Sequence, residues 1–189
     1  MSDLNILIVE GNNPKDSEVF IKAAKASCSE NFKNIVKELE PSSKVTIINP
    51  ANDNETKEAL KNMKQYDGII FTGGAMRLND MTEEIKKHIN FASNCFKYNN
   101  KILAICWGLQ VCSTAAGGKV APGKNGAHIG IAIDVEINEN GKNNPIYKNK
   151  KQKFNTPAFN FDEVVKVPKD AIHMASNSIN KIQGLNFKT

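Results

Sequence analysis

Cys106 stands where the sequence changes from a strand pattern to a helix pattern. Residues 102–105 form a short apolar run, Cys106 follows directly, and Gly108 lies just inside the next segment. A strand that turns sharply into a helix lifts the side chain at the turn clear of the sheet and places backbone N–H groups and the positive helix end beside it. Both features favour a thiolate, so we expect a lowered pKa and a nucleophilic Cys106. The alternative is a buried cysteine whose role is packing.

A pair of glycines, Gly73 and Gly74, follows a second apolar run. Without a side chain, glycine lets a backbone N–H come close to a ligand. If the two strands are neighbours, the N–H groups of Gly74 and Trp107 would converge on one oxygen and form an oxyanion hole, which is worth about 3–4 kcal/mol of transition-state stabilisation per donor. A tight turn without a binding role is the alternative for this pair.

The elements that must position these residues alternate between strand and helix patterns. Strands are predicted over residues 4–9, 45–48, 67–71 and 101–105, and helices over residues 19–24, 32–39, 55–64 and 82–96. This alternation predicts right-handed crossover connections and a mostly parallel sheet with helices on both faces. The loops that bind ligands in such a sheet lie at the carboxyl ends of its strands, where Gly73, Gly74 and Cys106 all occur.

The C-terminal half has a different character. Apolar and polar residues alternate over residues 129–137, which is typical of a half-exposed strand, and Asn140 with Gly141 predicts a turn. Shorter strand-like pieces follow at residues 163–167 and 171–175. We therefore expect a smaller antiparallel β extension, and, because no linker separates the halves, one domain over residues 1–189.

Composition limits the classes of function. No apolar run is long enough to span a membrane, the N-terminus lacks a signal-peptide pattern, and four cysteines without zinc or disulfide spacing fit a reducing compartment, so we expect a soluble cytoplasmic protein. The net charge is +5, but Arg77 is the only arginine among 25 basic residues. Because base and phosphate readout relies on arginine, we expect no nucleic-acid partner. The lysine-rich residues 148–153 are predicted to be a solvated loop.

The three histidines are scattered, without the spacing of a metal site, so no metal is expected. His88 falls on a predicted helix, where we expect it at the surface. His128 and His173 lie in the C-terminal half.

Four segments, in order along the chain, resemble class I glutamine amidotransferases, and most of all the stand-alone GMP synthase-like branch of that family. These segments are residues 104–110, residues 71–75 with Asp80, residues 117–120 with 129–132, and residues 157–164 with 167–168. The resemblance implies a flavodoxin-like, three-layer fold and hydrolysis of the glutamine side-chain amide through a γ-glutamyl thioester on Cys106. It also implies that Gly74 and Trp107 hold the oxyanion and that Gly73 and Gln110 bind substrate.

The same resemblance implies glutamine as the small-molecule substrate, no cofactor, and transfer of ammonia to an acceptor enzyme, which would be another chain.

The sequence departs from the family at several positions. Alanine replaces the first glycine of the nucleophile motif, and Asn160 and His128 stand where the family often has His and Glu. The His-x-Glu pair that serves as general base is not found near the C-terminus.

Three interpretations therefore stay open. The chain is a glutamine amidotransferase without its C-terminal catalytic segment, a thiol hydrolase acting on γ-glutamyl conjugates, or a non-catalytic binding or regulatory relative. In the first case we expect an uncovered sheet edge or apolar groove, which favours association into homodimers or aggregates.

Overall fold

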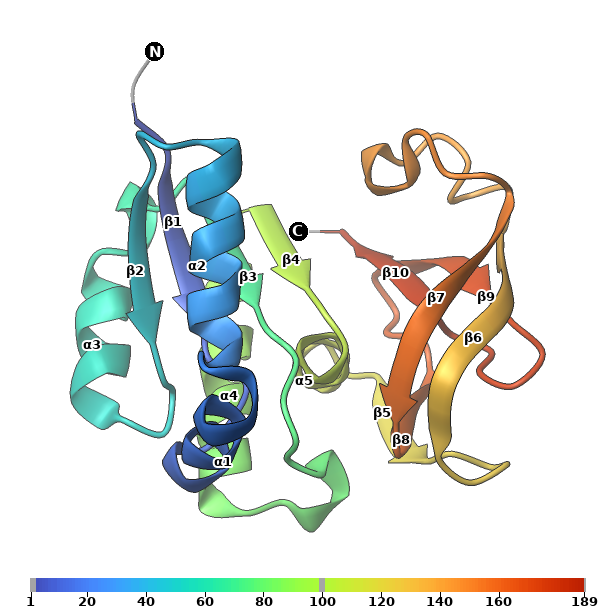
Figure 1. Cartoon of the computed structure of the whole chain (residues 1–189), viewed down its shortest axis with the longest axis horizontal. Helices are drawn as coiled ribbons and strands as arrows, with labels where there is room; N and C mark the ends of the chain where they lie inside the picture. Colours follow the sequence, from blue (N-terminus) through green and yellow to red (C-terminus); the bar gives the residue numbers. More distant parts are fainter. Residues whose placement is uncertain (1–2, 99–100, 189) are drawn as a thin grey trace. The chain divides into compact units, whose positions relative to one another are not determined.

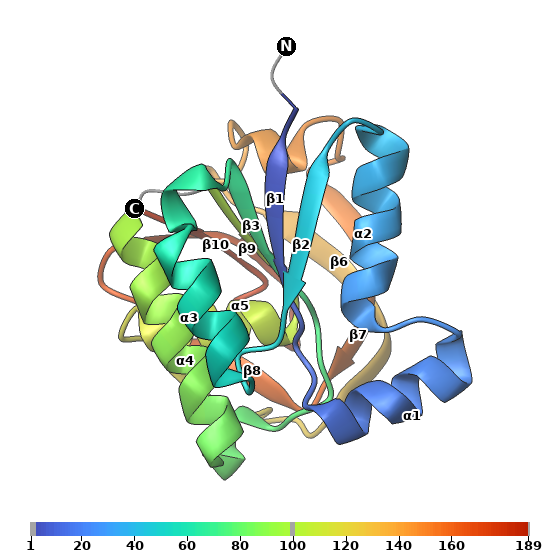
Figure 2. The same ribbon diagram turned by 90° about the vertical axis from the view of Figure 1, so that its left-hand side faces the viewer.

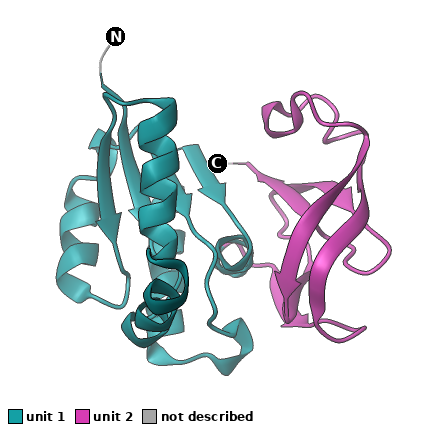
Figure 3. Cartoon of the chain, in the orientation of Figure 1, with its two compact units in different colours: residues 1–115, 189 teal, residues 116–188 magenta. Residues whose placement is uncertain are grey.

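The chain folds into two compact units. The computed structural model describes residues 3–98 and 101–188, and it divides after Ala115 into a first unit and a second unit that runs from Ala116 to Lys188 (Figure 3). Unit 1 contains one sheet and unit 2 contains two. The expectation of a single domain over residues 1–189 stays a prediction.

Unit 1 is built on a four-stranded parallel sheet with the order β2-β1-β3-β4 (Figure 1). Its strands are β1 (Asn5–Val9), β2 (Lys44–Ile48), β3 (Gly68–Phe71) and β4 (Lys101–Ala104). The central pair, β1 and β3, is in register from Ile6 opposite Gly68 to Val9 opposite Phe71, and β3 pairs with β4 up to Phe71 opposite Ala104. The carboxyl ends of these three strands therefore meet at one edge, as predicted.

Helices cover both faces of this sheet, which confirms the expected α/β class (Figure 2). The α-helices are α1 (Pro14–Ala24), α2 (Cys28–Leu39), α3 (Asp53–Lys61), α4 (Glu83–Cys95) and α5 (Trp107–Ala115). Short 3-10 helices are η1 (Met63–Gln65), η2 (Leu78–Asp80) and η3 (Phe96–Tyr98). Helix α2 lies on one face, while α3 and α4 lie on the other. Polar side chains at Asn13, Ser27, Asn52 and Thr82 cap the first four helices by accepting backbone N–H groups.

The core of unit 1 lies between the sheet and these helices. The side chains of Leu7, Ile8, Ile69 and Phe71 are fully buried, and the ring of Phe71 packs on Phe91 of α4 with the ring centroids 6.2 Å apart. At the opposite end of the strands from Cys106, a groove of about 590 Å³ opens over Leu4, Ile6 and Ile102 among others. The sequence predicts an uncovered sheet edge or apolar groove only if a C-terminal segment is absent, and both that expectation and association through this groove stay predictions.

His88 is buried, and the expectation of a surface histidine was wrong. It lies on α4 with no exposed surface, and its ring meets the ring of Trp107 edge-on at 4.8 Å between centroids. Neither ring nitrogen has a hydrogen-bond partner among the described residues. Burial therefore lowers the pKa of His88 from 6.5 to about 4.

We expect His88 to make stability fall as the pH drops. The unfolded chain binds a proton at His88 near pH 6.5, whereas the folded chain does so only near pH 4, so the free energy of unfolding decreases through this window. The loss from this one group amounts to about 3 kcal/mol at pH 4. Urea unfolding at pH 7 and pH 4 measures the decrease in the free energy of unfolding between the two conditions. This decrease should be smaller for His88→Leu than for the parent by about 3 kcal/mol. Equal losses in both proteins would contradict the assignment.

Unit 2 contains antiparallel sheets, as the sequence analysis predicted. A four-stranded sheet has the order β10-β9-β6-β7, and β5 pairs separately with β8. The strands are β5 (Lys119–Pro122), β6 (His128–Ile137), β7 (Lys153–Asn160), β8 (Asp162–Lys166), β9 (Ala171–Ser176) and β10 (Gly184–Phe187), with the 3-10 helix η4 (Pro145–Tyr147) between β6 and β7. Its core consists of Ala132, Val135, Ala158 and Ala175, with Tyr147 and Phe154 packed against it.

Asn140 and Gly141 lie in a turn, as predicted, within the fifteen residues that separate β6 from β7. Two other details of unit 2 differ from the sequence expectations. Strands β5, β7 and β10 were not predicted. Residues 157–160, which resemble a loop of the family, complete strand β7, where Pro157 lies opposite Ile131. Within the described residues, no helix is long and apolar enough to cross a lipid bilayer.

Candidate active site

Cys106 occupies a strained turn between a strand and a helix. Strand β4 ends at Ala104 and α5 begins at Trp107, and Cys106 between them has a φ of 54°. This left-handed conformation is uncommon for a residue with a side chain and persists only where the surroundings impose it. The residue is exposed. The turn therefore has the geometry of a nucleophile elbow, as predicted from the pattern around Cys106.

Hydrogen bonds to β3 and its exit loop hold this elbow. The N–H of Gly108 donates to the carbonyl oxygens of Thr72 at 3.1 Å and Ile105 at 2.9 Å, and the N–H of Ile105 donates to the carbonyl of Phe71 at 3.0 Å. A Cβ atom on Gly108 would lie 2.6 Å from that same Phe71 oxygen. Glycine is thus required here because α5 starts in direct contact with the neighbouring strand.

The structure brings the glycine pair next to Cys106. A Cβ atom on Gly73 would lie 3.6 Å from the Cβ of Cys106, so the two residues are in van der Waals range. Gly74 packs against the loop after β1, where a Cβ atom would lie 2.6 Å from the carbonyl carbon of Gly11. Among the described residues, the N–H of Gly74 has no protein acceptor. It is therefore available to a ligand, as an oxyanion donor requires, and that role stays a prediction.

Trp107 and Gln110 belong to the helix that begins at the elbow. The N–H of Trp107 donates to the sulfur of Cys106, and the N–H of Gln110 donates to the carbonyl of Cys106 at 3.2 Å. The Gln110 residue is 8 % exposed. Unit 1 thus contains every predicted site residue, with Trp107 next to Cys106 in the chain and Gly73 beside it across the sheet edge. The substrate-binding roles of Gly73 and Gln110 stay predictions.

The expectation of a lowered pKa for Cys106 was wrong. Although the residue is exposed, nearby protein atoms partly desolvate the sulfur, and this burial raises the pKa of the thiol above its usual value. The N–H of Trp107 acts in the opposite direction but is the weaker of the two influences. The helix end therefore assists the thiolate through one hydrogen bond and does not outweigh the desolvation.

Cys106 should nevertheless be the most rapidly alkylated cysteine near neutral pH. Burial raises the pKa of Cys28 to about 11 and that of Cys95 to about 12, and Cys112 is fully buried. A short iodoacetamide pulse followed by peptide mapping measures the four rates. Faster labelling of Cys28, Cys95 or Cys112 would contradict Cys106 as the reactive thiol.

The histidines do not supply a base at Cys106 in unit 1. His88 contacts Trp107 but hydrogen bonds to no described atom. His128 lies on β6 opposite Asn160, and His173 on β9 hydrogen bonds with the carbonyl of Ala175 at 2.8 Å, so both belong to unit 2. Over residues 3–98 and 101–188, no group of three or more His, Cys, Asp or Glu side chains could hold a metal ion.

Sequence reasoning missed a set of buried polar residues beside the glycine pair. Glu10, Asn12 and Thr72 are 4 %, 0 % and 0 % exposed, and all of them lie in the loops that follow β1 and β3. The sequence around Glu10 and Asn12 indicates only a turn. One feature of the sequence could have identified Glu10 and Asn12 as site residues. They follow directly after a buried strand, at the sheet edge where ligands bind in this class of fold.

Comparison with known proteins matches this chain to one family. The model of the family "Glutamine amidotransferase class-I" matches residues 23–189. A γ-glutamyl-L-1-hydroxyisopropylamide hydrolase from Pseudomonas sp. is 28 % identical over 191 residues, which cover 100 % of this chain and 64 % of that protein. The glutamine-hydrolysing GMP synthase subunit from Methanocaldococcus jannaschii is 31 % identical over 132 residues, or 70 % of this chain and 63 % of that protein.

A solved structure agrees with the fold. The crystal structure of a glutamine amidotransferase from Thermotoga maritima superposes with a TM-score of 0.76 at 17 % identity, covering 99 % of this chain and 73 % of that one. The chain spans less than two thirds of the length of the two sequence relatives.

Proposed function

Because the chain belongs to the class I glutamine amidotransferase family, we propose that it hydrolyses the side-chain amide of glutamine through a γ-glutamyl thioester on Cys106. The observation that carries this proposal is the exposed Cys106 on a strained elbow, in contact with Gly73 and with the N–H of Trp107. A thiol presented in this way suits attack on a planar carbonyl carbon.

In the proposed reaction, the Cys106 sulfur loses its proton and forms a bond to the γ-carbon. The carbonyl electron pair moves onto oxygen, and the N–H groups of Gly74 and Trp107 stabilise the resulting oxyanion. Collapse re-forms the carbonyl and breaks the C–N bond, and the nitrogen takes up a proton and leaves as ammonia. Water then adds to the thioester, and a second collapse releases glutamate and restores the thiol.

One step of this sequence depends on a proton carrier that His88 does not provide. His88 is neutral at pH 7, buried against Trp107, and without a hydrogen bond to Cys106. A missing general acid or base typically slows such a step by about 10²–10⁴-fold. We therefore expect slow turnover of glutamine by residues 1–189, and faster acylation by substrates whose leaving group needs less help.

A second candidate function is hydrolysis of γ-glutamyl alkylamides. The relative that matches along the whole chain is named for such a substrate. The same bond to the γ-carbon breaks in both reactions, and only the leaving amine differs. A non-catalytic role is the third interpretation, and the buried state of His88 is the structural observation that favours it.

We expect the ammonia acceptor to be a separate protein. This is supported by the relative that is named as one subunit of a GMP synthase. Four free cysteines support a reducing, cytoplasmic setting. Homodimer formation is proposed only as a consequence of the groove over Leu4, Ile6 and Ile102.

Competition between two amides tests the proposal. Glutamate is the common product of glutamine and γ-glutamyl isopropylamide, so one assay measures both. We expect kcat/KM to be higher for glutamine by about tenfold, because ammonia is a smaller and less basic leaving group than isopropylamine. A preference for the alkylamide would establish the second candidate. If neither amide yields glutamate in a Cys106-dependent way, the chain is not an amidase.

A further inference from the structure

The loops after β1 and β3 form one closely packed unit beside Cys106. The hydroxyl oxygen of Thr72 accepts the N–H of Gly11 at 2.9 Å, and the same hydroxyl donates to the carbonyl of Gly73 at 2.9 Å. A Cβ atom on Gly74 would lie 2.6 Å from the carbonyl carbon of Gly11. The conformation of the glycine pair is thus determined partly by the loop after β1.

Asn12 makes the most specific contact between these loops. Its side-chain oxygen accepts the N–H of Ala75 at 2.7 Å, directly after Gly74, and its side-chain nitrogen faces the sulfur of Cys28 at 3.6 Å. Its backbone carbonyl accepts from the side chain of Asn49 at 2.8 Å. The residue has no exposed surface, so losing any of these partners would leave a buried polar group unsatisfied.

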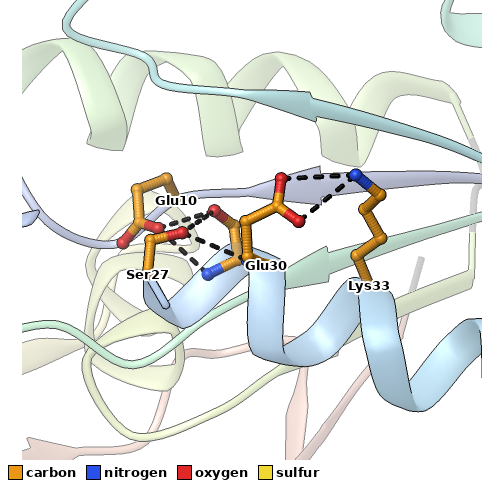
Figure 4. A network of polar contacts seen from close by, with 5 residues as sticks. Glu10, Ser27, Glu30 and Lys33 are labelled. Carbon is orange, nitrogen blue, oxygen red and sulfur yellow. Dashed lines mark hydrogen bonds and ion pairs between the residues drawn. The ribbon is translucent and has the colours of Figure 1, made fainter. Parts of the chain in front are cut away.

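Glu10 fixes Asn12 in turn to the start of helix α2. Figure 4 shows the Glu10 carboxylate beside Ser27 at this helix end. One carboxylate oxygen of Glu10 accepts the N–H of Asn12 at 3.0 Å, and the other accepts the N–H of Ser29 at 3.0 Å and its hydroxyl at 2.7 Å. Ser27 caps the same helix end and lies 3.0 Å from the Ser29 hydroxyl. Both oxygens of the buried carboxylate are therefore satisfied by donors from Asn12 and from the start of α2.

These contacts have a consequence for Gly74. The N–H of Ala75 and the carbonyl of Gly74 belong to one planar peptide group and point in opposite directions. When Asn12 holds that N–H, it also sets the orientation of the carbonyl and restricts the ψ rotation of Gly74. The N–H of Gly74, which has no protein acceptor among the described residues, belongs to the preceding peptide group, whose carbonyl oxygen on Gly73 accepts the Thr72 hydroxyl at 2.9 Å. Asn12 and Thr72 therefore hold the two peptide groups that flank Gly74, and together they fix the direction of its N–H.

From this geometry we infer that Asn12 is a positioning residue for the oxyanion loop, acting through Ala75 on the N–H of Gly74. The inference rests on the proposed function, since it assigns a residue to the same acylation step. Asn12 does not touch the reacting atoms. Glu10 and helix α2 hold Asn12 in place, so the β1 loop is part of the catalytic framework.

Two reactions of the same sulfur test this role. Acylation of Cys106 by L-γ-glutamyl-p-nitroanilide develops an oxyanion, whereas alkylation by iodoacetamide displaces iodide at a tetrahedral carbon and develops none. We expect Asn12→Ala to lower kcat/KM for p-nitroaniline release by about 10²-fold, as for a misplaced oxyanion donor. The alkylation rate of Cys106 should stay within about threefold of the parent, because the thiol itself is unchanged.

Two further variants make the result specific. Asn12→Asp keeps an oxygen acceptor for Ala75, so its acylation rate should recover to within about threefold of the parent. Asn144→Ala removes the side-chain cap of η4 in unit 2 and should leave acylation unchanged, because this cap makes no hydrogen bond to the β1 loop among the described residues. Unfolding measurements on every variant show that it is folded under the conditions in which its acylation and alkylation rates are measured.

Each outcome decides between the claims. If the parent is acylated and Asn12→Ala is acylated equally fast, or slows in proportion to its alkylation, the positioning role is overturned while the proposed function stands. If Asn12→Ala does not fold, the acylation rate of Asn12→Asp decides alone. A rate that is tenfold or more below that of the parent, which is the order expected when an oxyanion donor is lost, overturns the role. A parent chain that is never acylated at Cys106 overturns the proposed function together with this inference.

Discussion

Replacement of Cys106 by serine is expected to abolish release of p-nitroaniline from L-γ-glutamyl-p-nitroanilide, with a fall in kcat/KM of at least about 10⁴-fold. Serine retains the shape of the side chain, but its hydroxyl is a weak nucleophile unless a base activates it, and His88 is buried and makes no hydrogen bond to any described atom. The activated amide is chosen because its leaving group needs little protonation.

Cys95→Ala is the matched control for this substitution. Cys95 is a buried cysteine of α4, and its replacement by alanine leaves the elbow unchanged. We expect parent-like release of p-nitroaniline from Cys95→Ala, with a small loss of stability. Substantial activity in Cys106→Ser would show that another group forms the covalent bond.

Alanine at Gly73 should reduce activity without reducing stability. Its methyl group would lie at an ordinary contact distance, 3.6 Å, from the Cβ of Cys106 and would meet no other described atom within 4 Å. The protein should therefore fold normally, while the methyl group occupies space where the substrate carbonyl approaches the sulfur. We expect acylation to fall by about 10–10²-fold, the effect of a displacement of roughly 1 Å.

Gly74→Ala is the informative comparison, because the same change there should harm folding. Its Cβ would be forced against the backbone of Gly11, and relief requires the two loops to separate. Overpacking of this kind costs about 1–3 kcal/mol. Thermal unfolding and acylation measured on both variants separate the effects. A large loss of stability in Gly73→Ala, or none in Gly74→Ala, would contradict this account of the glycine pair.

Much of unit 1 follows from the sequence because its signals are local. The strand-like segments at residues 67–71 and 101–105 are followed by Thr72 with the glycine pair and by Cys106, and their predicted bounds agree with β3 and β4 to within one residue. The elbow at Cys106 was equally predictable, since a strand that leads directly into a helix requires a sharp turn. The four motifs also occur along the chain in the order found in the family, and this order supported the resemblance.

The parts that were not predicted depend on contacts between distant segments. Strand β7 contains Pro157 and follows a lysine-rich stretch, and it is a strand because it pairs with β6. His88 has the spacing of a surface residue, but α5 packs against α4 and Trp107 covers it. The raised pKa of Cys106 is likewise a property of its three-dimensional surroundings, and the pattern of residues 102–110 contains only the opposing influence of the helix end.

The polar residues behind the oxyanion loop show the same limit. Glu10 and Asn12 precede α1 in a turn-like sequence, and neither forms part of a motif that predicts chemistry. Their importance follows from the pairing of β1 with β3, which places Gly11 against Gly74 and Asn12 against Ala75. The loop after β1, which the sequence indicates only as a turn, therefore holds the glycine loop after β3 in place through these contacts.

The central claim is that Cys106 forms a thioester with the γ-carbonyl of glutamine or of a close amide. The most direct measurement is intact-mass spectrometry of the chain quenched in acid during reaction with L-γ-glutamyl-p-nitroanilide, followed by peptide mapping. We predict a mass increase of one γ-glutamyl group, located on the peptide that contains Cys106 and absent from Cys106→Ser. An unmodified parent chain, or a γ-glutamyl group on Cys28 or a lysine, would contradict the claim.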